Sequence, residues 1–435
     1  MAKSLGTLST HLLIAALALW CHLAAAQSRW TIADFQTVRL LNKFDSNGNG
    51  KLDGPEQACV RGAFGGIDVP MLPAEPFEYA DAALPQYIGS SDLAPLDNTT
   101  PDNRLSNPGA TLGRVLFYDR QLSQNNSVGC AACHEQQHGF ADPRRFSEGF
   151  EGGLTTRNSM SLANLRYSNH RGAKPGFFWD ERAATLEDQA LMPIQDRIEM
   201  GMTLDELELR LQKLPYYPAL FEAAFGSDDI TSDHVAKALA QFVRSLQSWD
   251  AKYDRAAAQT EGNMSANFAD FSEAENLGKS LFFDGSNGVA EFGCAHCHVP
   301  PTFGMPQSFN NGLDLKSADS GLGTLNRPSN DPFTPSNEGK FKAPSLRNVA
   351  LSSPYMHDGR LKTLEAVVEH YSGNVQPHEN LGLAFDDQQP DQPMGFRFTD
   401  PQQAALVAFL KTLTDERFIS DPRFADPFIR LTKTP

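Results

Sequence analysis

The chain has 435 residues, of which 40% are hydrophobic and 21% are charged, the balance of a folded protein rather than a disordered one. Its formal charge of −16 argues against nucleic acid or an anionic membrane as a partner and would suit a basic partner protein. Of its six cysteines, four lie in two Cys-x-x-Cys-His units, and Cys59 is expected to be a single buried thiol.

The N-terminus has the form of a secretory signal. Lys3 precedes an apolar run over residues 12–19, and residues 24–26 are the small alanines of a cleavage site. We therefore expect residues 1–26 to be removed and the chain to be exported to the periplasm, with Gln27 first in the mature protein. The run is too short for a membrane span, and no other stretch is apolar enough to cross a bilayer.

Residues 45–56 match a calcium-binding EF-hand loop. Oxygen ligands fall at positions 1, 3, 5, 7, 9 and 12, and glycine stands at position 6, where the loop turns. An apolar helix that enters the loop is expected from Trp30, Phe35, Val38, Leu41 and Phe44, so residues 27–65 would form a small structural module. The predicted calcium ligands are Asp45, Asn47, Asn49, the carbonyl of Lys51, Asp53 and Glu56.

The rest of the chain repeats itself once. Three similar segments recurring in one order indicate two homologous domains, expected over residues 66–255 and 256–435. Few stretches alternate as strands would, which predicts a mainly α fold with long ordered loops, including a helix over residues 232–253. The matched segments are 112–119 with 277–284, 161–164 with 345–348, and 179–187 with 357–365.

The two Cys-x-x-Cys-His units are typical of covalent c-type haem attachment. Two thiols three residues apart reach the two vinyl groups of one haem, and the adjacent imidazole then faces the iron. A zinc site, the alternative, would need a closed set of four ligands. The predicted haem-binding residues are Cys130, Cys133 and His134 in the first unit and Cys294, Cys297 and His298 in the second.

The ordered motifs of residues 85–420 resemble those of the bacterial di-haem cytochrome c peroxidase and MauG family. Besides the two haem-attachment units they are LGRxLFxD, FWDxRA and PSLRNVAxxxPYxHDGR. The resemblance implies two tandem c-type cytochrome domains with two covalent haems and an enzyme that reacts with hydrogen peroxide to form high-valent haem iron.

For the first haem, the resemblance implies an open coordination position. Conventional members carry a distal histidine where this chain has Phe150, and a phenyl ring cannot ligate iron; His138 is the alternative ligand. Gln189 and Pro193 match distal-pocket positions, the amide holding the bound peroxide. Glu199 matches the distal carboxylate, which relays a proton between the peroxide oxygens.

For the second haem, the resemblance implies Tyr371 as distal iron ligand, where conventional peroxidases have methionine, with His370 as the competing ligand. A phenolate favours higher oxidation states of iron than a thioether does. Trp179 matches a tryptophan between the haems and would carry electrons. An inter-haem calcium ion is also implied, with Asn158, Ser352 and the carbonyl of Pro354 as its ligands.

Three functions remain open. A MauG-like enzyme would oxidise a Trp or Tyr residue of a secreted partner protein. A conventional peroxidase would reduce peroxide to water with electrons from a small cytochrome or cupredoxin. A non-enzymatic electron carrier is the third. Phe150 and Tyr371 favour the first function, whereas Gln189 and Glu199 argue against the third, because a carrier needs no proton relay.

Overall fold

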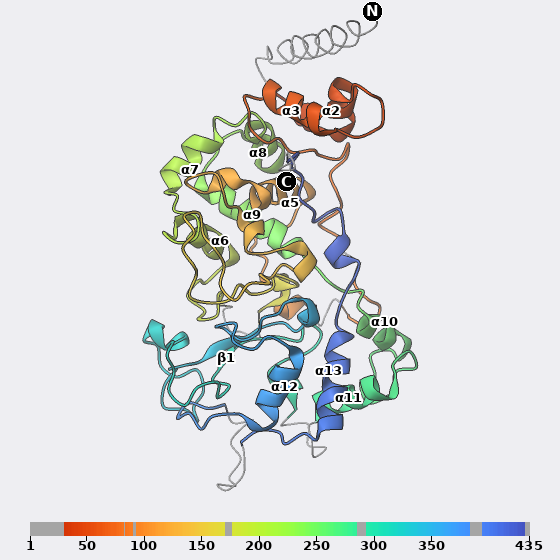
Figure 1. The fold of residues 1–435 in the computed structure, drawn as a ribbon, viewed down its shortest axis with the longest axis vertical. Coiled ribbons are helices and arrows are strands. Elements are labelled where there is room, and N and C mark those ends of the chain that lie inside the picture. Colours follow the sequence, from red (N-terminus) through yellow and green to blue (C-terminus); the bar gives the residue numbers. More distant parts are fainter. Residues whose placement is uncertain are drawn as a thin grey trace, which may run out of the picture.

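The computed structural model describes residues 30–81, 83–89, 93–169, 176–284, 293–382 and 394–430. The expected signal segment 1–26 lies outside them. Helices and long loops dominate the described part, as expected (Figure 1). The helices are α2 (Thr37–Phe44), α3 (Gly54–Ala63), α5 (Asn107–Tyr118), α6 (Leu186–Gln195), α7 (Leu204–Leu211), α8 (Tyr217–Phe225), α9 (Ser232–Ser245), α10 (Lys252–Gln259), α11 (Glu273–Asp284), α12 (Leu364–Gly373) and α13 (Asp400–Lys411).

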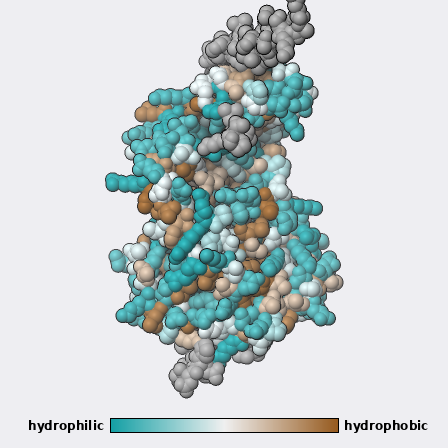
Figure 2. Space-filling view, in the orientation of Figure 1, coloured by the Kyte–Doolittle hydropathy of each residue, from teal (hydrophilic) through white to brown (hydrophobic). Residues whose placement is uncertain are grey.

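Two short antiparallel strands lie among the loops of the second half. They are β1 (Met305–Phe309) and β2 (Phe341–Ala343), and they pair Met305 with Ala343 and Phe309 with Phe341. No helix in the described part is long and apolar enough to cross a membrane. Figure 2 shows hydrophilic residues over most of one face of the molecule, with hydrophobic residues scattered among them.

Helices α2 and α3, joined by the predicted calcium loop, form one end of the molecule (Figure 1). Phe35 and Leu40 are buried and join the core of the first half. Val38, one of the apolar residues of the expected entering helix, lies in α2 but is 56% exposed. Cys59 is buried and disulfide-bonded, so the expectation of a single thiol is wrong.

The repeated segments adopt the same local structure in both halves. Helix α5 packs against α9, and α11 packs against α13. Each pair meets at a glycine: a Cβ on Gly113 would lie 2.0 Å from the carbonyl oxygen of Ala238, and one on Gly278 would lie 1.9 Å from that of Ala405. The backbones of each pair therefore approach more closely than any side chain would allow.

Asn164 and Asn348, which occupy equivalent positions in the two repeats, also have the same backbone conformation and the same kind of hydrogen bond. Asn164 and Asn348 are left-handed, with φ of 59° and 61°. The main-chain N–H of Asn164 donates to the carbonyl of Leu246 just after α9, and that of Asn348 donates to Leu413 just after α13. In both halves this segment is thereby attached to the residues that follow the second helix of the crossing pair.

The single helix expected over residues 232–253 is interrupted. Helix α9 ends at Ser245, and α10 begins at Lys252. Between them, Ser248 exchanges two hydrogen bonds with the side-chain amide of Asn164, at 2.6 and 3.0 Å. Asp415 accepts a further bond from the N–H of Asp250. These distant polar partners replace the hydrogen bonds that would continue the helix.

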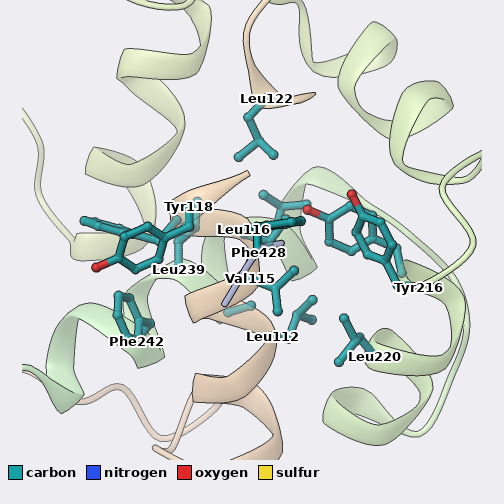
Figure 3. Close-up of a cluster of buried hydrophobic side chains, with 14 of the residues drawn as sticks. Leu112, Val115, Leu116, Tyr118, Leu122, Tyr216, Leu220, Leu239, Phe242 and Phe428 are labelled. Carbon is teal, nitrogen blue, oxygen red and sulfur yellow. The ribbon is translucent and has the colours of Figure 1, made fainter. Parts of the chain in front are cut away.

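The end of the chain returns to the first half. Phe418, Phe424 and Phe428 belong to the same buried cluster as α5, α8 and α9, and Figure 3 shows Phe428 among the leucines and valine of α5. The N–H of Ile429 donates to the carbonyl of Val69, and the hydroxyl of Tyr118 donates to that of Phe424. The first core thus contains residues from both ends of the described chain.

Replacing Gly113 with alanine should destabilise the protein by about 1–3 kcal/mol, because the added methyl group overlaps the backbone of α9. Urea unfolding of the haem-loaded protein measures the change. Gly62→Ala in α3 is the matched control, because nothing lies within 4 Å of its added methyl group. Equal stability of Gly113→Ala and wild type would contradict the close helix crossing.

Candidate haem sites

Each Cys-x-x-Cys-His unit forms a short 3-10 turn, over Cys130–Ala132 and Cys294–His296. The first turn lies against the end of α5, since a Cβ on Gly129 would be 3.0 Å from the carbonyl oxygen of Asp119. The four thiols are half-buried and unpaired. This arrangement leaves both thiols of each unit available for attachment to a haem.

The two histidines are held in the same orientation by main-chain carbonyls. Nδ1 of His134 lies 2.9 Å from the oxygen of Phe140, and Nδ1 of His298 lies 3.0 Å from that of Pro344. Burial lowers the pKa of both imidazoles, that of His298 to about 4. A neutral ring that donates through Nδ1 keeps a lone pair on Nε2, as an iron ligand requires.

A largely apolar cavity lies beside the second unit. Cys294, Cys297, His298 and Tyr371 all line it. A planar apolar macrocycle with one ligand on each side fits such a lining. Most of the other walls are aliphatic or aromatic, among them Phe282, Phe309, Leu346, Val368, Phe396 and Leu410.

Tyr371 and His370 face different surroundings. Burial is the main cause that raises the pKa of the Tyr371 phenol to about 12, and a hydrogen bond from Nδ2 of Asn311, at 3.3 Å, opposes it. Nε2 of His370 lies 3.0 Å from the carbonyl oxygen of Asn311. His370 is absent from the described cavity lining. The geometry therefore favours Tyr371 as the residue that faces the cavity.

Trp179 and the three residues of the predicted inter-haem calcium site line this same cavity, so both halves contribute to it. The indole N–H of Trp179 donates to the carbonyl of Asn158, at 2.8 Å, and the N–H of Asn158 donates to that of His357. Nδ2 of Asn158 donates to the carbonyl oxygen of Arg144. This bond points the side-chain oxygen of Asn158 away from Arg144. Ser352 and Pro354 complete the set that the structure brings together.

Glu199 lies close to the first unit. Burial and the neighbouring Asp196 raise its pKa to about 7, against the opposing charge of Arg182. Burial is the main cause that raises the pKa of the Cys130 and Cys133 thiols, and the negative charge of Glu199 adds to it. A carboxyl group that exchanges its proton near neutral pH therefore stands beside the first haem-attachment turn.

Phe150 is fixed next to Glu199. Its main-chain N–H donates to the carbonyl of Glu199 at 3.0 Å, and its ring lies so close to Gly201 that a Cβ there would be 2.5 Å away. His138, the alternative ligand, places Nδ1 3.2 Å from the carbonyl oxygen of Leu351 in the second half. This contact directs the imidazole of His138 toward the second half of the chain.

One correspondence was not recognised from the sequence. Helices α6 and α12 each begin after a capping threonine, Thr185 or Thr363, whose hydroxyl accepts an N–H. Counted from these caps, Pro193 and Tyr371 occupy the same helical position. Gln189 precedes Pro193 by four residues and shares its helix face. Extending the repeat past residue 187 would have revealed it.

The di-haem cytochrome c peroxidase family model matches residues 107–262 and 272–393. MauG of Methylorubrum extorquens is 36% identical over 72% of this chain and 80% of its own length. Cytochrome c551 peroxidase of Nitrosomonas europaea is 31% identical over 75% and 84%. The crystal structure of a MauG-like protein associated with microbial copper homeostasis matches with a TM-score of 0.63 and 33% identity, covering 80% of this chain and 99% of that one. The chain therefore belongs to the di-haem cytochrome c peroxidase and MauG family, and it is an enzyme that acts with peroxide.

Proposed function

We propose that the enzyme uses hydrogen peroxide to oxidise a Trp or Tyr residue of a secreted partner protein in the periplasm, in the manner of MauG. The single observation that carries this proposal is the difference between two equivalent helix positions, Pro193 in α6 and Tyr371 in α12. A proline ring offers iron no donor atom, whereas a phenol does. The two sites are thus expected to differ in whether peroxide can enter.

We assign the two halves, residues 66–255 and 256–435, as tandem haem domains. Cys130, Cys133 and His134 hold one haem, and Cys294, Cys297 and His298 hold the other. When bound, a c-type haem supplies an iron that can react with peroxide and exchange electrons. Whether a haem can react with peroxide depends on the residue that faces its iron on the side opposite to the histidine. At the first site, Phe150 and Pro193 provide no ligand on that side.

Glu199 and Gln189 prepare the first site for peroxide. With its pKa raised to about 7, the Glu199 carboxylate can accept the proton of one peroxide oxygen and return it to the other, which leaves as water. The Gln189 amide would donate a hydrogen bond to the same substrate. An electron carrier has no use for either group.

Tyr371 and Trp179 serve electron removal from the partner. Burial raises the pKa of Tyr371 to about 12, and the hydrogen bond from Asn311 to the phenol oxygen opposes that shift, so it favours the anionic form that would bind iron. Trp179 belongs to the first half and lines the cavity beside the second haem-attachment unit. Its ring would be an oxidisable station on the route between the two haems. The alternative, a conventional peroxidase fed by a small cytochrome or cupredoxin, would have a methionine at residue 371.

Two calcium ions complete the proposed holoenzyme. One would bind Asn158, Ser352 and Pro354 between the haems. The other would bind the EF-hand loop, where Asp45 already accepts hydrogen bonds from the N–H groups of Gly48 and Gly50. Asp53 accepts from the amides of Asn47 and Asn49, bonds that a cation would replace. In the part of the chain that is described, no three acidic, His or Cys side chains are already gathered as a metal cluster.

The ferric holoenzyme should contain one haem with a vacant position, and it should react with peroxide without prior reduction. Tyr371→Met should introduce a sulfur-to-iron charge-transfer band and raise the second haem potential, yet leave the peroxide reaction at the first haem intact. Tyr355→Phe is the control, because Tyr355 lines the same cavity but donates to the carbonyl of Val349. Absorption spectra and redox titration measure these changes.

Three results would contradict this proposal. If both haems prove six-coordinate, the first haem has no vacant position for peroxide and the proposed MauG-like function is wrong. If reduced cytochrome c is consumed rapidly and no partner protein is modified, the enzyme is a conventional peroxidase. An unchanged second-haem spectrum in Tyr371→Met would show that another residue ligates that iron.

The peroxide reaction should slow as the pH falls through about 7, because Glu199 must be ionised to accept a proton. Glu199→Gln should be slower by about 10²–10⁴-fold and lose this pH dependence. Because folding raises the pKa of this acid, wild-type stability relative to the variant should decline as the pH rises from about 4.5 to about 7. Stopped-flow absorption measures the rate of the peroxide reaction, and urea unfolding measures the stability difference. The exposed Glu151→Gln is the control, and an unchanged pH profile in Glu199→Gln would refute the relay.

Protein dialysed against calcium should retain two ions per chain, and Asn47→Ala should retain one, because the EF-hand loop loses a side-chain oxygen. Atomic absorption measures the stoichiometry. Asn42→Ala, on the exposed side of α2 before the loop, should retain both ions. If Asn47→Ala still retains two calcium ions per chain, the second ion does not bind in the EF-hand loop.

A further inference from the structure

We propose that Tyr217, Asp119 and Tyr216 form a relay of electrons and protons that leads from the first haem to Trp30 in the N-terminal module. The relay deepens the proposed function, because it needs a first haem that peroxide can oxidise. It gives that haem a second outlet, toward the N-terminal module rather than toward Trp179 and the cavity beside the second haem-attachment unit.

The three side chains form one buried cluster. The hydroxyls of Tyr216 and Tyr217 donate to the same carboxylate oxygen, Oδ2 of Asp119, at 2.8 and 2.7 Å. Both tyrosines are fully buried, and Asp119 is 4% exposed. The other carboxylate oxygen accepts the N–H of Gln121 at 2.8 Å. The carboxylate therefore stands ready as the proton acceptor for either phenol.

Burial makes proton transfer a condition of electron loss. It raises the pKa of both phenols well above 10, and it raises the pKa of Asp119 as well. A phenol that loses an electron becomes strongly acidic, and a buried charge without a partner is costly. Asp119 removes that cost, since the proton moves along a hydrogen bond that is already formed.

The cluster adjoins the first haem-attachment turn. Asp119 directly follows α5, and its carbonyl oxygen touches Gly129, the residue before Cys130. Cys130 packs against the buried cluster that contains Tyr216 and Tyr217, and its charge contributes to the raised pKa of Tyr217. Tyr217 is therefore the member of the pair nearer to the first haem-attachment turn.

The second half shows that the haem turn does not require this cluster. Asp284 holds the position equivalent to Asp119 in the repeat, but it is exposed and accepts a hydrogen bond from the hydroxyl of Ser280. A buried aspartate shared by two tyrosines is thus a feature of the peroxide-reactive half alone among the described residues.

Aromatic contacts continue the route outward. Tyr216 lies 4.7 Å from Tyr217 between ring centres and 5.9 Å from Phe35, and Phe35 lies 5.9 Å from Trp30. Figure 3 shows Tyr216 at the edge of the first core, beside Leu116 and Phe428. Trp30 is half-buried and lines a surface pocket next to Lys43. The route ends where a partner can reach it.

The electrons and protons balance along this route. Tyr217 gives one electron toward the first haem, and its O–H proton passes to Oδ2 of Asp119. Tyr216 then gives an electron to Tyr217, Asp119 returns the proton to Tyr217, and the Tyr216 proton takes its place. Trp30 finally reduces Tyr216, which recovers that proton, and the indole proton leaves to solvent. Peroxide is the oxidant, and its reduction to two waters consumes two such electrons.

Freeze-quenched electron paramagnetic resonance of the holoenzyme mixed with one equivalent of peroxide tests the relay. Wild type should give a protein radical whose hyperfine lines narrow when the tyrosines are ring-deuterated. Tyr217→Phe should lose this tyrosyl signal, and Tyr216→Phe should lose oxidation of Trp30 by excess peroxide, read by mass spectrometry. Tyr118→Phe is the matched control: Tyr118 is also buried beside Asp119, but it donates to a main-chain carbonyl, which cannot take its proton.

The outcomes separate the relay from the function on which it rests. If peroxide changes the haem absorption but Tyr217→Phe keeps the wild-type tyrosyl signal, the relay is wrong and the proposed function stands. If peroxide leaves the haem absorption unchanged in wild type, both are wrong. Asp119→Asn should slow radical formation while leaving the haem spectrum unchanged. If Asp119→Asn fails to fold, Tyr217→Phe still tests the relay, because phenylalanine fills nearly the same space as tyrosine.

Discussion

The close crossing of paired helices at Gly113 and Gly278 is the constraint on which both halves depend. Because the backbones of α5 and α9, or of α11 and α13, are in direct contact, the end of the first helix in each pair is fixed in space. The haem-attachment turns follow these ends, and Gly129 lies against the last carbonyl groups of its helix. The position of each Cys-x-x-Cys-His unit is therefore determined by backbone packing rather than by loop conformation.

The duplicated scaffold carries different chemistry in its two copies. The same capped helix presents proline in one half and tyrosine in the other, and the same aspartate is buried in one half and exposed in the other. None of these differences lies in the middle of a helix crossing: Pro193 and Tyr371 belong to α6 and α12, outside the crossing pairs, and the two aspartates stand at the ends of α5 and α11. The same scaffold can therefore present a proline in one half and a phenol in the other.

The haem-attachment units and the two tandem domains were predicted from local chemistry and spacing, and they stay predictions. The mainly α fold and the family were confirmed. The break after Ser245 was not predictable, since it is caused by Asn164 and Asp415, which are distant in sequence. The Asp119 cluster was missed for the same reason: nothing in the sequence brings Tyr216 and Tyr217 to a residue nearly a hundred positions earlier. Roles of the distal residues still rest on resemblance.

The return of residues 418–430 to the first core has a consequence for how the protein is made. Phe418, Phe424 and Phe428 pack against Phe140, Phe242 and Tyr216 in the first core, so the N-terminal half lacks part of its interior until residues 418–430 have been synthesised. Maturation cannot then proceed strictly half by half from the N-terminus. A chain interrupted near its end would keep both attachment motifs and still have an unfinished first domain.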